Sequence, residues 1–163
     1  ECPTTYLSTI SFQNGSVIRL TLSFDVIAHQ RNHIELYGDK GSIIVPDPNM
    51  FGGSVYTCKK LGDPWKEHKT NKMPLGKINI RSQSSRANES STNSNYRGAG
   101  LAEMAYSIQN KKINKCNGEL SLHILDIIQS MMKACKTGKA QSIKTTCKKP
   151  QPFSLNEIRR ILK

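Results

Sequence analysis

The sequence lacks any long apolar run and any of the short motifs that bind nucleotides or zinc. No stretch of its 163 residues approaches the roughly 20 apolar residues needed to cross a bilayer. The mean hydropathy is -0.51. HExxH, P-loop, GxGxxG and GxSxG patterns are all missing. These absences argue against a membrane protein, a zinc enzyme, a self-sufficient nucleotide-binding protein and a serine hydrolase. They leave a soluble globular chain of ordinary domain size.

A leader sequence is also missing. The chain opens with Glu1-Cys2-Pro3 and passes directly into strand-like sequence, without a start methionine. We therefore expect a cytoplasmic protein, and we interpret Glu1 as a cut end, which would make the chain either a fragment of a longer chain or a processed product.

The five cysteines are not arranged in pairs. The number of cysteines is odd, no two form a CxxC, and the four histidines show no ligand spacing. This pattern argues against a disulfide framework and against a metal site, so we expect reduced thiols and no bound metal. The cysteines are Cys2, Cys58, Cys116, Cys135 and Cys147.

Positive charge is abundant but uneven. The net charge is +12, and residues 1–66 are neutral, with six basic and six acidic side chains. The basic excess of residues 67–163 is the main argument for the alternative function, a stand-alone module that binds a polyanion or nucleic acid. Against it, the basic residues are scattered and no aromatic residues interleave with them. We favour a solvated basic surface, which makes a nucleic-acid partner the weaker hypothesis.

The first part of the chain has the pattern of a β-hairpin. Alternating residues 5–13 and 16–24 flank Asn14-Gly15, which is typical of a two-residue type I′ turn. That turn predicts that Gln13 faces Ser16. One face of the hairpin would then be half apolar, and we expect another domain or subunit to cover it in part. The half-apolar face would carry Tyr6, Ile10, Phe12, Val17 and Arg19, and the core face Leu7, Thr9, Ile18, Leu20, Leu22 and Phe24.

A second hairpin is predicted in the stretch IELYGDKGSIIVPDPNMFGG, residues 34–53. Ile34 and Leu36 would face Ile43 and Val45 across a turn that leaves a bulge, with left-handed Gly41. Prolines follow at once and end the strand, because proline cannot donate to a ladder. Residues 54–60, and less clearly 64–80, predict further strands.

The apolar period changes from two to 3.6 in the last third of the chain. Residues 81–97 form a polar loop that we expect to be mobile. Two helices with one apolar stripe each follow, and a short helix over 154–162 begins with a capping box. Strands first and helices last indicate an α+β fold with helices packed on one face of a sheet. The apolar stripe of the first helix is Leu101, Met104, Ala105 and Ile108. The stripe of the second, longer helix is Leu120, Ile124, Ile127, Ile128 and Met131, with Asn117 as its N-cap and Gly138 at its C-terminal end. The capping box of the short helix is the pair Ser154 and Glu157.

Few residues suggest chemistry. His123 and Asp126 lie three residues apart on the longer helix, and we interpret them as a helix-surface contact rather than a catalytic pair. Gly98-Ala99-Gly100 precedes a helix and fits a helix-entry turn better than an anion site. We therefore assign no catalytic residue to this chain.

Four stretches carry a resemblance to a known family. FQNGSVIRLTLSFDV, IELYGDKGSIIVPDPNMFGG, YRGAGLAEMAYSIQNKK and NGELSLHILDIIQSMM occur in this order. Together they resemble the C-terminal domain of the Gfo/Idh/MocA oxidoreductases, over about residues 4–153. The resemblance implies a large open, mainly antiparallel β-sheet with helices packed on one face. The other face would form the substrate site and a subunit interface, and residues 46–53 would shape the rim of the sheet.

The resemblance also implies what this chain does. It would be a single substrate-binding and oligomerisation domain over residues 1–163, acting on a sugar, polyol or related hydroxy compound. NAD or NADP would bind to an N-terminal Rossmann domain, which is absent here together with the family's catalytic lysine segment. We therefore expect no cofactor binding and no activity from this chain alone. The candidate substrate contacts are Tyr96, Arg97 and His29, and Arg97 could equally anchor the loop to the following helix.

Overall fold

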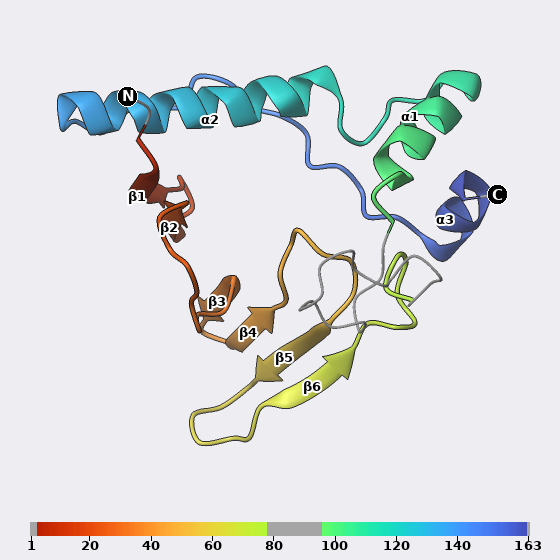
Figure 1. Ribbon diagram of the computed structural model, residues 1–163, viewed down its shortest axis with the longest axis horizontal. Helices are drawn as coiled ribbons and strands as arrows, with labels where there is room; N and C mark the ends of the chain where they lie inside the picture. Colours follow the sequence, from red (N-terminus) through yellow and green to blue (C-terminus); the bar gives the residue numbers. More distant parts are fainter. Residues whose placement is uncertain (1–2, 78–95, 163) are drawn as a thin grey trace. The chain divides into compact units, whose positions relative to one another are not determined.

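The computed structural model describes residues 3–77 and 96–162, which fall into two compact units. Residues 1–31 and 119–147 make up the first unit, and 32–118 and 148–163 the second. The predicted α+β class is confirmed, with antiparallel strands followed by helices, and the strands form two sheets of two and four (Figure 1). The elements are β1 (Thr5–Ser11), β2 (Val17–Ser23), β3 (Ile34–Gly38), β4 (Gly41–Val45), β5 (Ser54–Cys58), β6 (Lys66–Lys69), α1 (Ala99–Gln109), α2 (Gly118–Thr137) and α3 (Leu155–Ile161).

The hairpin β1–β2 forms where it was predicted, but with a different register. Ser11 pairs with Val17, and Phe12 N–H donates to Ser16 O at 2.9 Å. Three residues therefore make the loop, and the last of them, Gly15, has φ +86°. A three-residue loop that ends in a left-handed glycine is the second common hairpin geometry. The predicted pairing of Gln13 with Ser16 is wrong by one residue.

This register changes the two faces of the hairpin, because a one-residue slip turns one strand over relative to the other. All the large aliphatic residues of β2 except Val17 now share a face with Tyr6 and Ile10. The other face is mostly Ser and Thr, and Thr5 Oγ1 lies 2.7 Å from Ser23 Oγ. The predicted half-apolar face does not exist in this hairpin. The observed apolar face carries Tyr6, Ile10, Ile18, Leu20 and Leu22.

The four-stranded sheet runs in the order β3-β4-β5-β6, all antiparallel. Ile34 pairs with Val45 and Leu36 with Ile43, as predicted. Gly41 has the expected positive φ, +131°, but it pairs directly with Gly38, so the predicted bulge is wrong. The register places all the aliphatic side chains of the sheet except Ile44 on one face. They are Ile34, Leu36, Ile43, Val45 and Val55.

The helix α2 belongs mainly to the first unit and has the predicted ends. It begins at Gly118, directly after the predicted cap Asn117. At its other end Gly138 has φ +65° and donates its N–H to Ala134 O at 2.8 Å. The side chains of α2 are half-buried or exposed, and Ile124 is 47% exposed.

The helix α1 buries the face opposite to the predicted one. Leu101 is 75% exposed and Ile108 is 72% exposed, whereas Ala99, Glu103 and Ser107 are buried. The buried residues are spaced four apart and the two exposed ones seven apart, so each set forms one side of the helix. The contact between helices in the second unit is that of α1 with α3. The prediction of a buried apolar stripe on α1 is therefore wrong.

The short helix α3 begins with the predicted capping box. Glu157 N–H donates to Ser154 Oγ at 3.2 Å, and Ser154 N–H donates to Glu157 Oε2 at 2.7 Å. The hydrogen bonds from Ser154 and the positive charge of Lys115 lower the pKa of the Glu157 carboxyl. Ile158 is the buried apolar residue of this helix.

Candidate substrate-facing rim of the four-stranded sheet

The loop from Pro46 to Gly53, which joins β4 to β5, has a backbone that restricts its sequence. Gly53 has φ +92°, and a Cβ added there would lie 2.8 Å from Pro46 Cβ. Asp47 closes a local turn by accepting the Asn49 N–H on Oδ1 at 2.9 Å. Position 53 therefore requires glycine, because only glycine tolerates both the dihedral angle and the contact.

A second segment, residues 70–76, fastens this loop. Thr70 Oγ1 donates to Gly53 O at 2.6 Å, and Met73 N–H donates back to Thr70 O at 2.8 Å. A Cβ at the buried Gly76 would lie only 2.1 Å from Thr70 O. Thr70 therefore joins the two segments, and position 76, which packs against its carbonyl oxygen, must be glycine.

Of the three predicted substrate contacts, Tyr96 lies against this loop. Its ring meets Phe51 edge to face, with ring centroids 5.8 Å apart, and its hydroxyl donates to Lys77 O at 2.9 Å. Arg97 follows it directly and is exposed, one residue before the α1 N-cap. The structure thus brings Tyr96 and Arg97 to the same part of the second unit as the Pro46–Gly53 loop.

His29, the third candidate, is an exposed residue of the first unit. Sequence reasoning missed Phe51 and Thr70 as partners of the rim. Phe51 could have been suspected because it is a lone large aromatic residue within a Pro- and Gly-rich loop. No sequence pattern pointed to Thr70. The predicted polar loop 81–97 lies outside the described residues, apart from Tyr96 and Arg97.

His123 and Asp126 each form a hydrogen bond with the hydroxyl of Thr145. Thr145 Oγ1 donates to Asp126 Oδ2 at 2.9 Å, which uses its one proton. His123 Nδ1, 3.0 Å from the same oxygen, must then be the donor in that contact. Asp126 also accepts the N–H groups of Thr145 and Lys144, and these bonds lower the pKa of its carboxyl. The group fastens residues 144–145 to α2.

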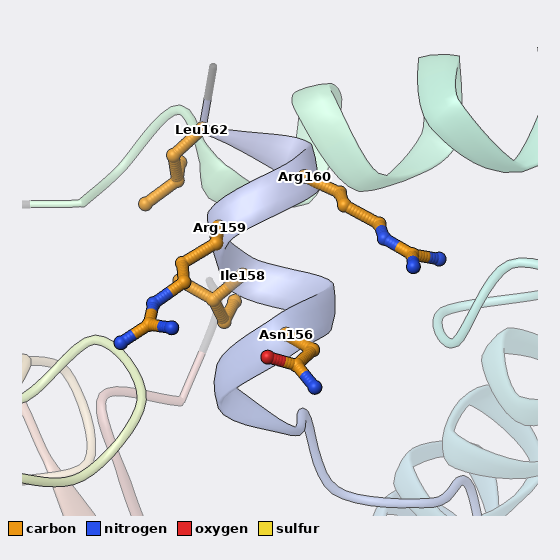
Figure 2. A pocket seen from close by; sticks show the side chains of 5 residues that line it. All are labelled: Asn156, Ile158, Arg159, Arg160 and Leu162. Carbon is orange, nitrogen blue, oxygen red and sulfur yellow. The ribbon is translucent and has the colours of Figure 1, made fainter.

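An open depression on α3 does not form a binding site. Figure 2 shows Arg159 and Arg160 extending to opposite sides of the helix, so their guanidinium groups do not converge on one ligand. An anion site requires such convergence. The depression is lined by Asn156, Ile158, Arg159, Arg160 and Leu162.

The part of the chain that the structure describes shows no group of three or more His, Cys, Asp or Glu side chains that could hold a metal ion. Four cysteines are free thiols. No helix within residues 3–77 and 96–162 is long and apolar enough to cross a membrane. The thiols are Cys58, Cys116, Cys135 and Cys147.

Comparison with known families gives a match that spans most of the chain. Residues 3–145 match the model described as "Oxidoreductase family, C-terminal alpha/beta domain", which is the C-terminal domain of the Gfo/Idh/MocA family. The chain belongs to this family, and it is the family's C-terminal domain. A domain of this kind implies an N-terminal partner domain. Searches of curated proteins and of solved structures found no match.

Proposed function

We propose that this chain is the substrate-binding and subunit-interface domain of an NAD(P)-dependent oxidoreductase. The substrate would be a sugar, a polyol or a related hydroxy compound. The match of residues 3–145 to the oxidoreductase domain carries this proposal. On this view the two compact units serve together as one domain of the enzyme.

The residues that the structure describes do not provide the backbone turn that a dinucleotide cofactor needs. A pyrophosphate site of that kind needs a glycine-rich turn that leads from a strand into a helix N-terminus. The positive-φ glycines of the described residues lie elsewhere, for example in the hairpin turns at Gly15 and Gly41, and α1 is entered from Gly98 with φ −77°. The nicotinamide would therefore bind to the partner domain, and we assign no hydride-transfer step to this chain.

Tyr96, Arg97 and His29 are the proposed substrate contacts. Arg97 is exposed and follows Tyr96, which contacts the Pro46–Gly53 loop through Phe51, and its guanidinium can donate two parallel hydrogen bonds to a hydroxyl pair or a carboxylate. Tyr96 holds the backbone at Lys77 and contacts Phe51, which supports a fixed position for its neighbour. A rigid element is the better platform for a substrate-binding side chain.

The test is steady-state kinetics of this domain joined to its N-terminal partner domain, with nicotinamide absorbance followed across a panel of sugars and polyols. We expect Arg97→Ala to raise KM about tenfold or more, since hydrogen bonds to a charged group contribute about 1.5–3 kcal/mol. Arg19→Ala, which changes charge equally on an exposed strand, is the matched control and should leave KM unchanged. Absence of nicotinamide-dependent turnover on every compound would refute the proposed function. An unchanged KM in the Arg97 variant would refute only the residue assignment.

The aliphatic face of the four-stranded sheet supports the proposed interface role. Leu36 is 53% exposed and Ile43 is 36% exposed, although both lie on a face of β-branched and aliphatic residues. Exposed apolar surface of this kind marks protein contacts. Sedimentation of the two-domain enzyme should show a homo-oligomer, and Leu36→Lys should shift it toward monomer. A wild-type enzyme that remains monomeric at high concentration would contradict this role.

A further inference from the structure

The side chain and backbone of Lys115 join two distant parts of the second unit. Its N–H donates to both carboxylate oxygens of Glu103 on α1, at 3.1 and 3.3 Å. Its Nζ donates to Gln151 O at 2.9 Å and lies 3.5 Å from Glu157 Oε1. The same Nζ lies 4.9 Å from the centroid of the Phe153 ring. One lysine therefore contacts the C-terminal segment through a hydrogen bond, an ion pair and a cation–π contact.

The helix α3 cannot hold its structure without this kind of support. It has seven residues, and isolated helices shorter than about 12–15 residues are marginal in water. Its capping box closes one end, but Ile158 is its buried apolar residue, while Leu155 is 50% exposed. The helical state of α3 therefore depends on its contact with α1 and on Lys115.

The α1 face buried in the second unit is small and polar. Ala99, Glu103 and Ser107 form it, and Ser107 Oγ donates to Glu103 Oε1 at 3.0 Å. Uncovering such a face exposes groups that water can solvate, so opening costs far less than exposing a hydrophobic core. The apolar side of α1, with Leu101 and Ile108, lies on the opposite side of the helix.

We propose that residues 150–162 form a releasable strap, docked on α1 and controlled by the charge of Lys115. With the ammonium in place, the strap is docked and α3 is helical. In a variant that lacks this ammonium, the ion pair and the cation–π contact are lost and the hydrogen bond to Gln151 O is weakened, so residues 155–161 become a coil. The whole strap lies beyond residue 145, where the family match ends.

Hydrogen exchange measured by mass spectrometry on the full chain tests the strap. In Lys115→Gln, we expect the amides of 155–161 to exchange about tenfold faster or more, with α2 and the four-stranded sheet unchanged. Lys133→Gln makes the same charge change on an exposed position of α2 and is the matched control. Glu157 is not a suitable target, because its carboxylate also closes the capping box.

A salt series separates the strap from general support of the fold. In the wild type, added salt should speed exchange of 155–161, because the ion pair is screened, whereas in Lys115→Gln salt should add little. The proposal is overturned if Lys115→Gln leaves exchange of 155–161 within twofold of wild type. It is also overturned if exchange of β3–β6 rises by the same factor as that of the strap, since Lys115 would then support the whole unit.

Discussion

The end of α1 provides the sharpest stability prediction, because a lysine there occupies a position suited to glycine. Lys111 has φ +53°. Its N–H donates to Ile108 O at 3.2 Å, and Lys112 N–H donates to Ser107 O at 2.8 Å. This is the Schellman arrangement of a helix C-terminus, in which the left-handed residue is usually glycine. Substituting Lys111→Gly should therefore stabilise the second unit.

The magnitude follows from two opposing effects. A non-glycine residue in the left-handed region costs roughly 1–2 kcal/mol, which the substitution would remove. Glycine adds backbone entropy to the unfolded chain, which costs about 0.5–1 kcal/mol. We expect a net gain of about 0.5–1 kcal/mol in the free energy of unfolding, or about 1–4 °C in Tm for a chain of this length.

Thermal and urea unfolding followed by circular dichroism measure this gain, and Lys111→Ala is the matched control. Alanine removes the lysine side chain but keeps the Cβ, so its stability should remain close to that of the wild type. Equal stabilisation by glycine and alanine would show that lost side-chain charge, not backbone strain, explains the effect. A less stable Lys111→Gly variant would refute the reasoning outright.

Two further predictions concern the sheet and the first unit. Gly41→Ala should destabilise the four-stranded sheet by about 1–3 kcal/mol or more, because the added Cβ would lie 2.5 Å from Cys58 O and the backbone has φ +131°. Gly62 also has a positive φ, +87°, but has open space around it, so Gly62→Ala should be less destabilising. Urea unfolding measures both variants. The carboxyl pKa of Asp126 is lowered by the N–H groups of Thr145 and Lys144 and by the Thr145 hydroxyl, so its contribution is complete above its ordinary pKa of 3.8 and is lost as pH falls below it. Exchange protection of residues 144–145 should fall in that acid range, and Asp126→Asn should abolish this pH dependence; unchanged dependence would show that another group is responsible.

Features set by neighbours in the chain could be predicted from the sequence. The capping box at Ser154 and the glycine at 138 were correct, because each needs only residues within one turn of the helix. The register of β3 with β4 was correct because aliphatic residues alternate on both strands. The family resemblance was confirmed because its four stretches are local patterns in the right order.

Features that depend on a choice between two similar local solutions could not be predicted. Asn14-Gly15 fits a two-residue turn and also the end of a three-residue loop, and the choice determines which side of β2 faces Tyr6. On α1 the apolar stripe was expected to be buried, whereas the buried side carries Glu103, whose carboxylate is satisfied by Lys115 from another segment.

The candidate site shows the same division between local and distant information. The rim loop could be anticipated from its prolines and glycines, since these residues restrict the backbone wherever they occur. Its fastening by Thr70 and the contact of Phe51 with Tyr96 join residues 17 and 45 positions apart. The residue pattern within a single helix or strand cannot predict contacts between segments this far apart in the sequence.

The bond between Lys115 and Glu103 also has a consequence for the order in which the chain assembles. It spans 12 positions, and the turn at Lys111 lies inside that span, so this motif can close soon after its residues leave the ribosome. The bond from the same lysine to Gln151 spans 36 positions. Because short loops close at lower entropic cost, the α1 motif should form first and present the Lys115 ammonium as a donor to residues 150–162 when they are synthesised. Residues 150–162 would then dock after the remainder of the second unit has been translated.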